Sequence, residues 1–196
     1  MNDPVITPNT DKRALILDGA ERVFVARGFA AARVEDIAEE AGVAKGTIYL
    51  YFASKQEVFV SLIEVRAQEL VLSLQNQLFE IQSAALVLKS LVRIKVEFYL
   101  KHLGLIDQAF QWAPQLEQEL QARLIVSRSS IAEASTHHLS KFIPAAFPVS
   151  MLVVTGVIDG AVNGIVLNAI EAQEVIDAEK IAEDVVFLLL PGMLQR

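Results

Sequence analysis

The chain has 196 residues, a net charge of −7 at pH 7, no cysteine, and 53% hydrophobic residues. The absence of cysteine excludes disulfide bonds and thiolate chemistry, and it suits a reducing compartment such as the cytoplasm. The acidic balance argues against a protein that coats nucleic acid regardless of its sequence.

The mean hydropathy of +0.40 is high for a soluble protein, so a membrane-spanning helix has to be considered. The longest uncharged run, residues 142–158, contains Pro144 and Pro148 and stops at Asp159. A spanning helix needs about 20 apolar residues, which this run does not supply. The first residues also lack the basic start and apolar stretch of a signal peptide. We therefore expect a cytoplasmic protein without a membrane partner.

The N-terminal part of the chain begins with an arm and a helix. Residues 1–9 include Pro4 and Pro8 and are predicted to form a flexible arm. A helix should begin near Thr10 and end at Gly28, because Thr can cap a helix N-terminus and Gly can end a helix. Its apolar residues at helical spacing are Ile16, Ala20, Val23 and Phe24.

Residues 34–52 carry two short apolar periodicities separated at Gly42, which is the pattern of a helix-turn-helix. The first helix places Val34, Ile37, Ala38 and Ala41 on one face. In the second helix Ile48 and Phe52 can turn inward together, because they are four residues apart. Gly46 and Tyr49 then face outward, with Lys45 and Thr47 on the flanks. Such a surface can meet DNA.

The charges in this segment are unevenly distributed. Residues 41–55 contain Lys45 and Lys55 and no acidic residue, whereas residues 56–196 hold more acidic than basic residues. This pattern predicts a small cationic tip on an acidic body. DNA affinity should then fall as salt rises, because bound phosphates release counterions.

Helices are also predicted for the rest of the chain. Ser54 and Glu57 have the spacing of a capping box, which predicts a fourth helix that continues to about residue 81. At about 1.5 Å per residue this helix would span roughly 40 Å. Further helices are expected near residues 84–101, 105–111, 114–140, 149–171 and 177–190. The predicted fold is all-α, with a three-helix DNA-binding head at residues 10–53 and a larger helical bundle at residues 54–196.

The head resembles that of the tetracycline-repressor (TetR) family in three stretches: Gly28-Phe29, Val34-x-x-Ile37-Ala38, and Ala41-Gly42-Val43-x-Lys45-Gly46-Thr47-Ile48-Tyr49-x-Tyr51-Phe52-x-Ser54-Lys55. The resemblance covers residues 11–62. It implies a transcriptional repressor that reads a palindromic operator in double-stranded DNA as a homodimer. It also implies that a small-molecule effector, bound in the body, releases the DNA.

By position, the resemblance implies base-edge contacts from Lys45, the Gly46 backbone and Tyr49, and phosphate contacts from Thr47, Tyr51 and Lys55. Two positions depart from the family, whose members often carry Ser or Thr where this chain has Ala32 and Ala44. Those positions cap the two helices and touch phosphate, and a lost cap costs ~1 kcal/mol. We hypothesise that Arg33 replaces one of the lost phosphate contacts.

The residues themselves leave the role of Lys55 open between a solvated surface charge and a phosphate contact. A cation at a helix N-terminus is unfavourable unless an anion is nearby. The phosphate contact is favoured because other candidate DNA contacts lie close by in the sequence, namely Lys45, Thr47, Tyr49 and Tyr51.

Gly156, Gly160 and Gly164 recur every four residues in an otherwise apolar helix. Three glycines cost about 2 to 3 kcal/mol of helix propensity, so close approach of another helix should offset them. That helix could belong to the same bundle or to a second subunit, and the family resemblance favours a dimer interface. Alternatively, Asp159 and Asn163 on the same helix could face a cavity as polar anchors for a ligand.

Five ring-bearing residues lie in the middle helices, where the family's pocket generally lies: Phe98, Tyr99, His102, Phe110 and Trp112. Aromatic residues at helical spacing are more often core than ligand contacts. Trp112 precedes an apparent helix break at Pro114 and is the strongest candidate for a lining residue. The implied effector is apolar or aromatic.

The sequence gives little support for a catalytic site or a metal site. Glu133 and His137 have a spacing that could hold zinc, but no third ligand is evident. No nucleophile lies at a recognisable spacing from a base. We therefore predict no enzyme activity, no metal and no cofactor. The alternative to a DNA-binding regulator is a helical small-molecule-binding or interaction module that does not bind DNA.

Overall fold

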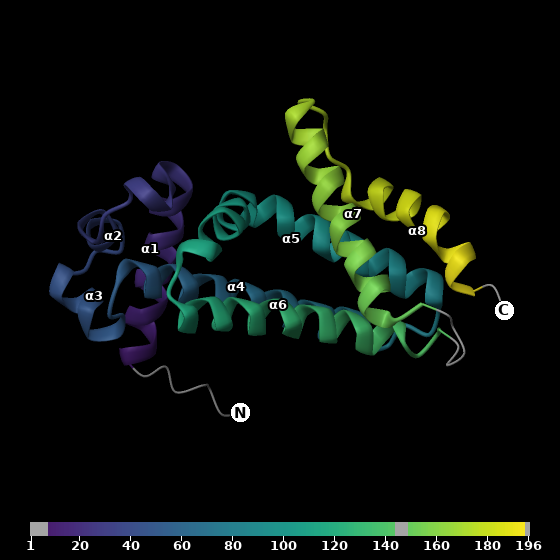
Figure 1. Ribbon diagram of the computed structural model, residues 1–196, viewed down its shortest axis with the longest axis horizontal. Coiled ribbons are helices and arrows are strands. Elements are labelled where there is room, and N and C mark those ends of the chain that lie inside the picture. The colour runs from purple at the N-terminus through teal and green to yellow at the C-terminus, as the bar shows by residue number, and fades with distance from the viewer. Residues whose placement is uncertain (1–7, 144–148, 195–196) are drawn as a thin grey trace. The chain divides into compact units, whose positions relative to one another are not determined.

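The computed structural model describes residues 8–143 and 149–194, and these ranges contain helices and no strand (Figure 1). The α-helices are α1 (Pro8–Ala31), α2 (Val34–Glu40), α3 (Lys45–Tyr51), α4 (Lys55–Leu78), α5 (Ala84–Trp112), α6 (Gln118–Leu139), α7 (Met151–Glu171) and α8 (Ala178–Leu194). A short 3-10 helix, η1 (Ala113–Gln115), follows α5. The predicted all-α fold is confirmed. The predicted arm and Pro144 and Pro148 fall mainly or wholly outside the described residues.

The described residues group into two compact units. The head unit comprises residues 8–66 and 104–125, and the body unit comprises residues 67–103, 126–143 and 149–194. Helices α4, α5 and α6 each contribute residues to both units. The head unit therefore takes in more of the chain than the segment 10–53 that carries the helix-turn-helix pattern.

Aromatic side chains form the centre of the head unit. The ring centroids of Phe24, Phe29 and Phe59 lie 4.7 to 5.7 Å from one another. Gln108 is buried beside them, where its Nε2 donates to the Phe24 carbonyl at 2.9 Å and its Oε1 accepts from the Phe29 amide at 2.5 Å. A buried backbone amide or carbonyl without a partner would be costly, so Gln108 satisfies two such groups within the core.

The turn between α2 and α3 follows the sequence prediction. Gly42 has a φ of +66°, which glycine adopts without steric cost. Its N–H donates to the Glu39 carbonyl, and the Val43 N–H donates to the Ala38 carbonyl. These two bonds form a Schellman motif, which satisfies carbonyls at the end of α2.

A close helix crossing in the head depends on a glycine that the sequence pattern does not single out. A Cβ atom on Gly19 in α1 would lie 2.9 Å from the Ala41 nitrogen at the end of α2. Such a distance is shorter than a van der Waals contact, so a side chain here would force α1 and α2 apart. Gly19 therefore helps to fix the helix-turn-helix against α1.

The helix boundaries confirm some predictions and correct others. Ser54 Oγ accepts from the Glu57 amide as predicted, while the Glu57 carboxylate accepts from the Ala53 amide. The two helices predicted at 84–101 and 105–111 are continuous in α5, with a kink at His102 where the break between them was expected. The chain departs from helical geometry at His102, with a φ of −119°, and then continues. Pro114 lies in η1 rather than in α6.

The body unit has an aliphatic core from all five of its helical segments, including Leu74, Leu88, Leu91, Ile158 and Val162. Helix α7 is long and apolar enough to cross a membrane by length and composition alone, and 22% of its most apolar stretch is buried in the structure. The core helices of soluble proteins can be equally long and apolar. One side of α7 packs into the body core, and the exposed side needs a separate explanation.

Candidate functional site

The outward face of α3 is built by the helical period. Ile48 and Phe52 are buried in the head core, as predicted. Tyr49 is 49% exposed, and a Cβ on Gly46 would meet no atom within 4 Å. The face that carries Lys45, Gly46 and Tyr49 is therefore exposed.

Leu50 belongs to the same face and was missed by the sequence reasoning. It is 82% exposed. A side chain this exposed buries little apolar area in the head core, so it remains available for an apolar contact with a partner. The exposure of Leu50 could have been predicted from the sequence, because Leu50 directly follows Tyr49 and lies away from the side of the helix that carries Ile48 and Phe52.

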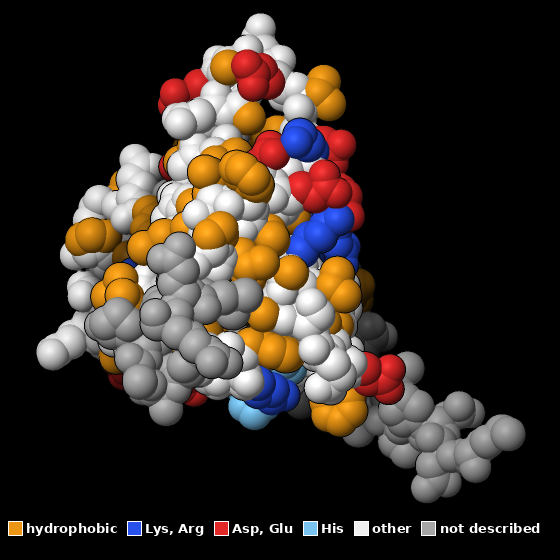
Figure 2. All heavy atoms as spheres, turned by 90° about the vertical axis from the view of Figure 1, so that its right-hand side faces the viewer, with side chains coloured by type: hydrophobic (Ala, Val, Ile, Leu, Met, Phe, Trp, Pro, Cys, Tyr) orange, Lys and Arg blue, Asp and Glu red, His pale blue; other side chains and the backbone are white. Residues whose placement is uncertain are grey.

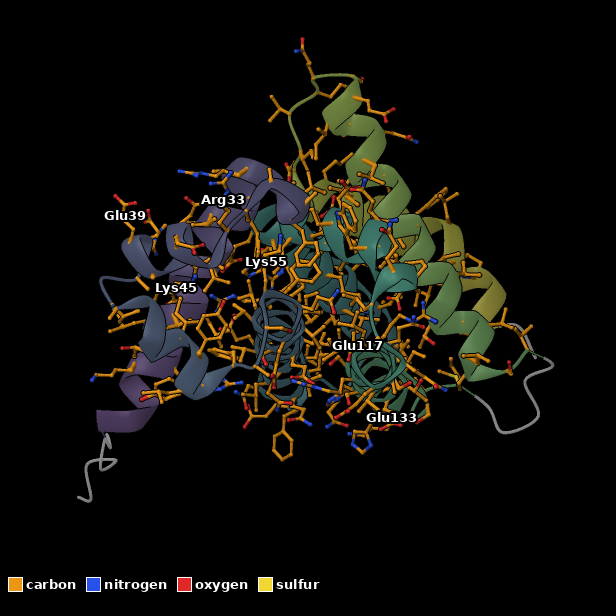
Figure 3. All side chains as sticks on the ribbon, turned by 60° about the vertical axis from the view of Figure 1, so that its left-hand side comes forward. Arg33, Glu39, Lys45, Lys55, Glu117 and Glu133 are labelled. Atoms are coloured by element: carbon orange, nitrogen blue, oxygen red, sulfur yellow. The ribbon has the colours of Figure 1, made fainter. Side chains whose placement is uncertain are left out.

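The predicted cationic tip is not an isolated positive charge. Lys45 lies at the start of α3 (Figure 3). Its Nζ is 2.5 Å from Oε1 of Glu35 in α2 and 5.9 Å from the centre of the Tyr49 ring. The hydrogen bond to Lys45 lowers the pKa of Glu35, and the bond to Glu35 raises the pKa of Lys45. Both groups therefore remain charged near neutral pH, and the carboxylate offsets the lysine charge locally.

Lys55 has a third role that the sequence analysis did not consider. Its ammonium donates to the carbonyls of Phe29, Ala30 and Ala32 at 2.6, 3.2 and 2.8 Å. It also lies 4.6 Å from the centre of the Phe29 ring. Burial lowers the pKa of Lys55. An ammonium has three N–H donors, so a phosphate contact would require one of these bonds to be given up.

The helix caps differ from the expectation at one of two positions. Ala44 is the N-cap of α3 and provides no side-chain hydrogen bond. The N-cap of α2 is Arg33, while Ala32 precedes it and is buried, so the proposed lost cap at Ala32 was wrong. The Arg33 amide donates to Oδ2 of Asp36 at 3.0 Å. The side chain of Arg33 is exposed at the start of α2. Thr47 and Tyr51 are half-buried.

The three glycines of α7 face open space. A Cβ on Gly156, Gly160 or Gly164 would meet no atom within 4 Å. Packing against another helix of the same chain was one interpretation of these glycines, and that interpretation was wrong for the described residues.

Asp159 lies on the same helix and forms an ion pair with Lys95 of α5. Lys95 is 1% exposed, and Asp159 is partly exposed. Tyr99, one turn after Lys95, is largely buried. Burial raises the pKa of Tyr99, and the charge of Asp159 adds to that increase. Lys95 was not among the predicted site residues, because nothing in its local sequence pattern indicates that a lysine will be buried.

The five ring-bearing residues do not form one cluster. In the body unit, the rings of Phe98 and His102 lie 4.8 Å apart. Phe110 and Trp112 belong to the head unit. Trp112 packs there against the Phe29 ring at 5.5 Å, and Phe110 is exposed. Asn163 is half-buried on α7, one turn after Asp159.

Comparison with known proteins assigns the head. Residues 16–62 match the bacterial regulatory proteins of the tetR family. Residues 16–62 belong to the TetR family. The match includes α2, α3 and the buried residues Ile37 and Ile48, so the sequence resemblance and the observed helix-turn-helix agree.

Proteins similar to this chain include transcriptional regulators. The uncharacterized HTH-type transcriptional regulator YfiR of Bacillus subtilis is 40% identical over 35% of this chain and 34% of its own length. The fatty acid metabolism regulator protein of the same organism is 28% identical over 64% of this chain and 61% of its own length. The aligned region thus covers less than two thirds of either relative.

A solved structure extends the likeness to the whole TetR-type fold. The fatty acid degradation regulator FadR from Bacillus halodurans superposes with a TM-score of 0.77 and 25% identity, over 100% of both chains. The body unit therefore shares a fold with a regulator of known structure.

Proposed function

We propose that this protein is a transcriptional regulator that binds double-stranded DNA through the outward face of α3. The observation that carries the proposal is the exposure of Lys45, Gly46 and Tyr49 on a helix whose opposite side is fixed by buried Ile48 and Phe52. A helix supported in this way can enter the major groove and present side chains to base edges. The TetR-family match of the same residues supports this role.

Each residue of this surface has a proposed contact. Lys45, the Gly46 backbone and Tyr49 contact base edges, and Leu50 adds an apolar contact to a thymine methyl group. Phosphate contacts come from Thr47, Tyr51 and Arg33, which fix the position of the head on the duplex. Lys55 supports the surface from within through its bonds to the carbonyls at the end of α1.

The body unit is proposed to form a homodimer through α7 and α8. The glycine face of α7 lies beside exposed Leu152 and Val157, and Phe187 of α8 is 80% exposed. Figure 2 shows hydrophobic side chains gathered on this side of the molecule. Exposed apolar side chains grouped in this way favour an interface, and a two-fold pairing would bury them on both copies. A two-fold dimer predicts a pseudo-palindromic operator with half-sites about 34 to 36 Å apart, or slightly more.

The proposed effector is an apolar molecule bound in the body unit, with Phe98, Tyr99, His102, Asp159 and Asn163 as candidate contacts. Two of the relatives are named for fatty acid metabolism or degradation. These names favour an effector with a long acyl chain over an aromatic one. Binding regulates DNA affinity if the effector binds one of two body conformations more tightly. We propose release of DNA, and therefore repression, as the outcome.

The test begins with DNA binding by the wild-type protein. Duplexes are selected from a randomised pool, and affinity is measured by fluorescence anisotropy at several salt concentrations. Tight binding to a palindromic consensus, weakened by salt, supports the proposal. Lys45→Ala should relax base preference at one position of each half-site. Arg33→Ala should weaken all duplexes evenly and reduce the salt slope by about one. Lys101→Ala, an exposed lysine of the body unit, is the control.

The effector proposal is tested with the same complex. Long-chain fatty acids and their thioesters are added at increasing chain length, with short-chain acids as controls. Release that strengthens with chain length supports an acyl effector. If the wild-type protein selects no consensus and shows no salt-dependent binding, the alternative of an interaction module without DNA binding is favoured.

A further inference from the structure

Glu35 makes an ion pair that differs in position from the other ion pairs of α2. Asp36 pairs with Arg27 at 2.8 Å, and Glu40 pairs with Arg22 at 2.6 Å, so both fasten α2 to α1. Glu35 pairs instead with Lys45, the first residue of α3. Its partner is therefore a residue of the surface that we propose meets DNA.

The Glu35–Lys45 pair lies on the surface. The two side chains are 58% and 50% exposed, so solvent and salt screen their attraction. Exposed ion pairs of this kind contribute little to folding stability. The helix-turn-helix is already fixed by buried Ile37 and Ile48 and by the turn at Gly42. Removal of the pair should therefore leave the helix-turn-helix folded.

The geometry restricts what Lys45 can do. The ammonium is held by Glu35 on one side and by the Tyr49 ring, 5.9 Å from its centre, on the other. A contact with a phosphate would bring the Glu35 carboxylate close to a second negative charge. A guanine edge offers neutral acceptors at O6 and N7 and carries no such repulsion. Because an ammonium has three donors, Lys45 can bond to a base edge while it keeps its bond to Glu35.

We propose that Glu35 is a specificity-determining residue that positions Lys45 for a base edge and disfavours its contact with phosphates. Glu35 thereby weakens binding to arbitrary DNA more than binding to the operator. This inference rests on the proposed DNA-binding function of α3, and it adds a residue that lies outside the outward face of that helix.

The decisive variant is Glu35→Gln, which removes the charge and nearly preserves the shape. Glu39→Gln is the matched control, because Glu39 is an exposed acid on the same helix and the charge change is identical (Figure 3). Affinities are measured for the duplex selected by the wild-type protein and for a scrambled duplex of equal length, over a series of salt concentrations.

Glu35→Gln should tighten binding to the scrambled duplex several-fold more than binding to the selected duplex. The salt slope on the scrambled duplex should steepen by about one, because freed Lys45 then neutralises one more phosphate. Glu39→Gln should affect both duplexes alike and to a smaller extent. In a Lys45→Ala background, Glu35→Gln should no longer change the ratio of the two affinities.

Three results would contradict the proposal, each in a different way. Equal effects of Glu35→Gln and Glu39→Gln on the ratio of affinities would overturn the role of Glu35 while the DNA-binding function stands. A change in the ratio that persists with Lys45→Ala would show that Glu35 acts as a general charge and would overturn its action through Lys45. Absence of DNA binding by the wild-type protein would overturn the proposed function and this inference together.

Discussion

The ammonium of Lys55 in α4 and the carbonyl of Phe29 in α1 are 2.6 Å apart, and the same ammonium lies 4.6 Å from the Phe29 ring. The carbonyls of Ala30 and Ala32 complete its set of acceptors. The residue that follows the helix-turn-helix thus fastens the end of α1 to the start of α4. A cation is favourable at the C-terminal end of a helix, where carbonyls have no helical partner.

Lys55→Met should therefore reduce stability rather than DNA contact. We expect the free energy of unfolding to fall by about 1 to 3 kcal/mol, because the partly buried carbonyls lose a charged donor. Urea denaturation measures the change, with the exposed Lys12→Met as control. If Lys55→Met unfolds like the wild type but binds all DNA more weakly, with a salt slope lower by about one, the phosphate role predicted from the sequence would be right instead.

The Lys95–Asp159 pair should be a strong stability determinant of the body unit. Asp159→Asn leaves a fully buried ammonium without its carboxylate, and such changes cost about 3 to 5 kcal/mol in buried pairs. Partial exposure of Asp159 places the expected loss near the lower end of that range. The double variant Lys95→Met with Asp159→Asn should recover most of it, because no unpaired charge remains.

This comparison is made by urea denaturation at one fixed protein concentration, because dimerisation would contribute to apparent stability. Additive losses in the double variant would show that the two residues do not act as a pair. In that case the body unit would depend on Lys95 and Asp159 for separate reasons.

Gly160→Leu should disrupt the proposed dimer without unfolding the monomer. The site has no neighbour within 4 Å in the same chain, and leucine has a higher helix propensity than glycine. We expect sedimentation velocity to show a shift from dimer to monomer, with helicity retained. Glu133→Leu, which adds the same side chain at an exposed position of α6, should leave the association unchanged. A Gly160→Leu protein that remains dimeric would place the interface elsewhere.

Acid should destabilise the body unit through His138. Burial, together with the positive charges of Lys141 and His137, lowers the pKa of His138 below 6.5. Between the folded and unfolded pKa values the unfolded chain holds more protons, so the unfolding free energy falls as pH is lowered through about 6.5. The loss is complete once the pH is below the folded-state pKa.

The measurement is urea denaturation at pH 7.5 and pH 5.5. The decrease in the free energy of unfolding from pH 7.5 to pH 5.5 should be smaller in His138→Gln than in the wild type, by about 1.4 kcal/mol for each unit of pKa shift. His137→Gln, at the exposed neighbouring position, should retain most of the decrease, since burial is the larger cause. An equal decrease in wild type and His138→Gln would assign the pH dependence to other groups.

The sequence alone determined the features that depend on neighbours within one or two helical turns. The positions of α2 and α3, the glycine turn between them, the burial of Ile48 and Phe52 and the exposure of Tyr49 all follow from helical periodicity and from the φ that Gly42 can adopt. The same residues carry the TetR-family resemblance that the family match confirms. These features were predictable because each is decided by local geometry.

Only the tertiary structure decided which distant groups became partners. Glu35 reaches Lys45, Lys55 reaches the carbonyl of Phe29, and Lys95 reaches Asp159. It also decided that Trp112 packs in the head and that the α7 glycines face away from the rest of the described chain. Periodicity shows which side of a helix is buried, but it does not show which segment covers that side. Charged groups find their partners only after the helices have packed, so ion pairs are the part of this protein that its sequence pattern leaves open.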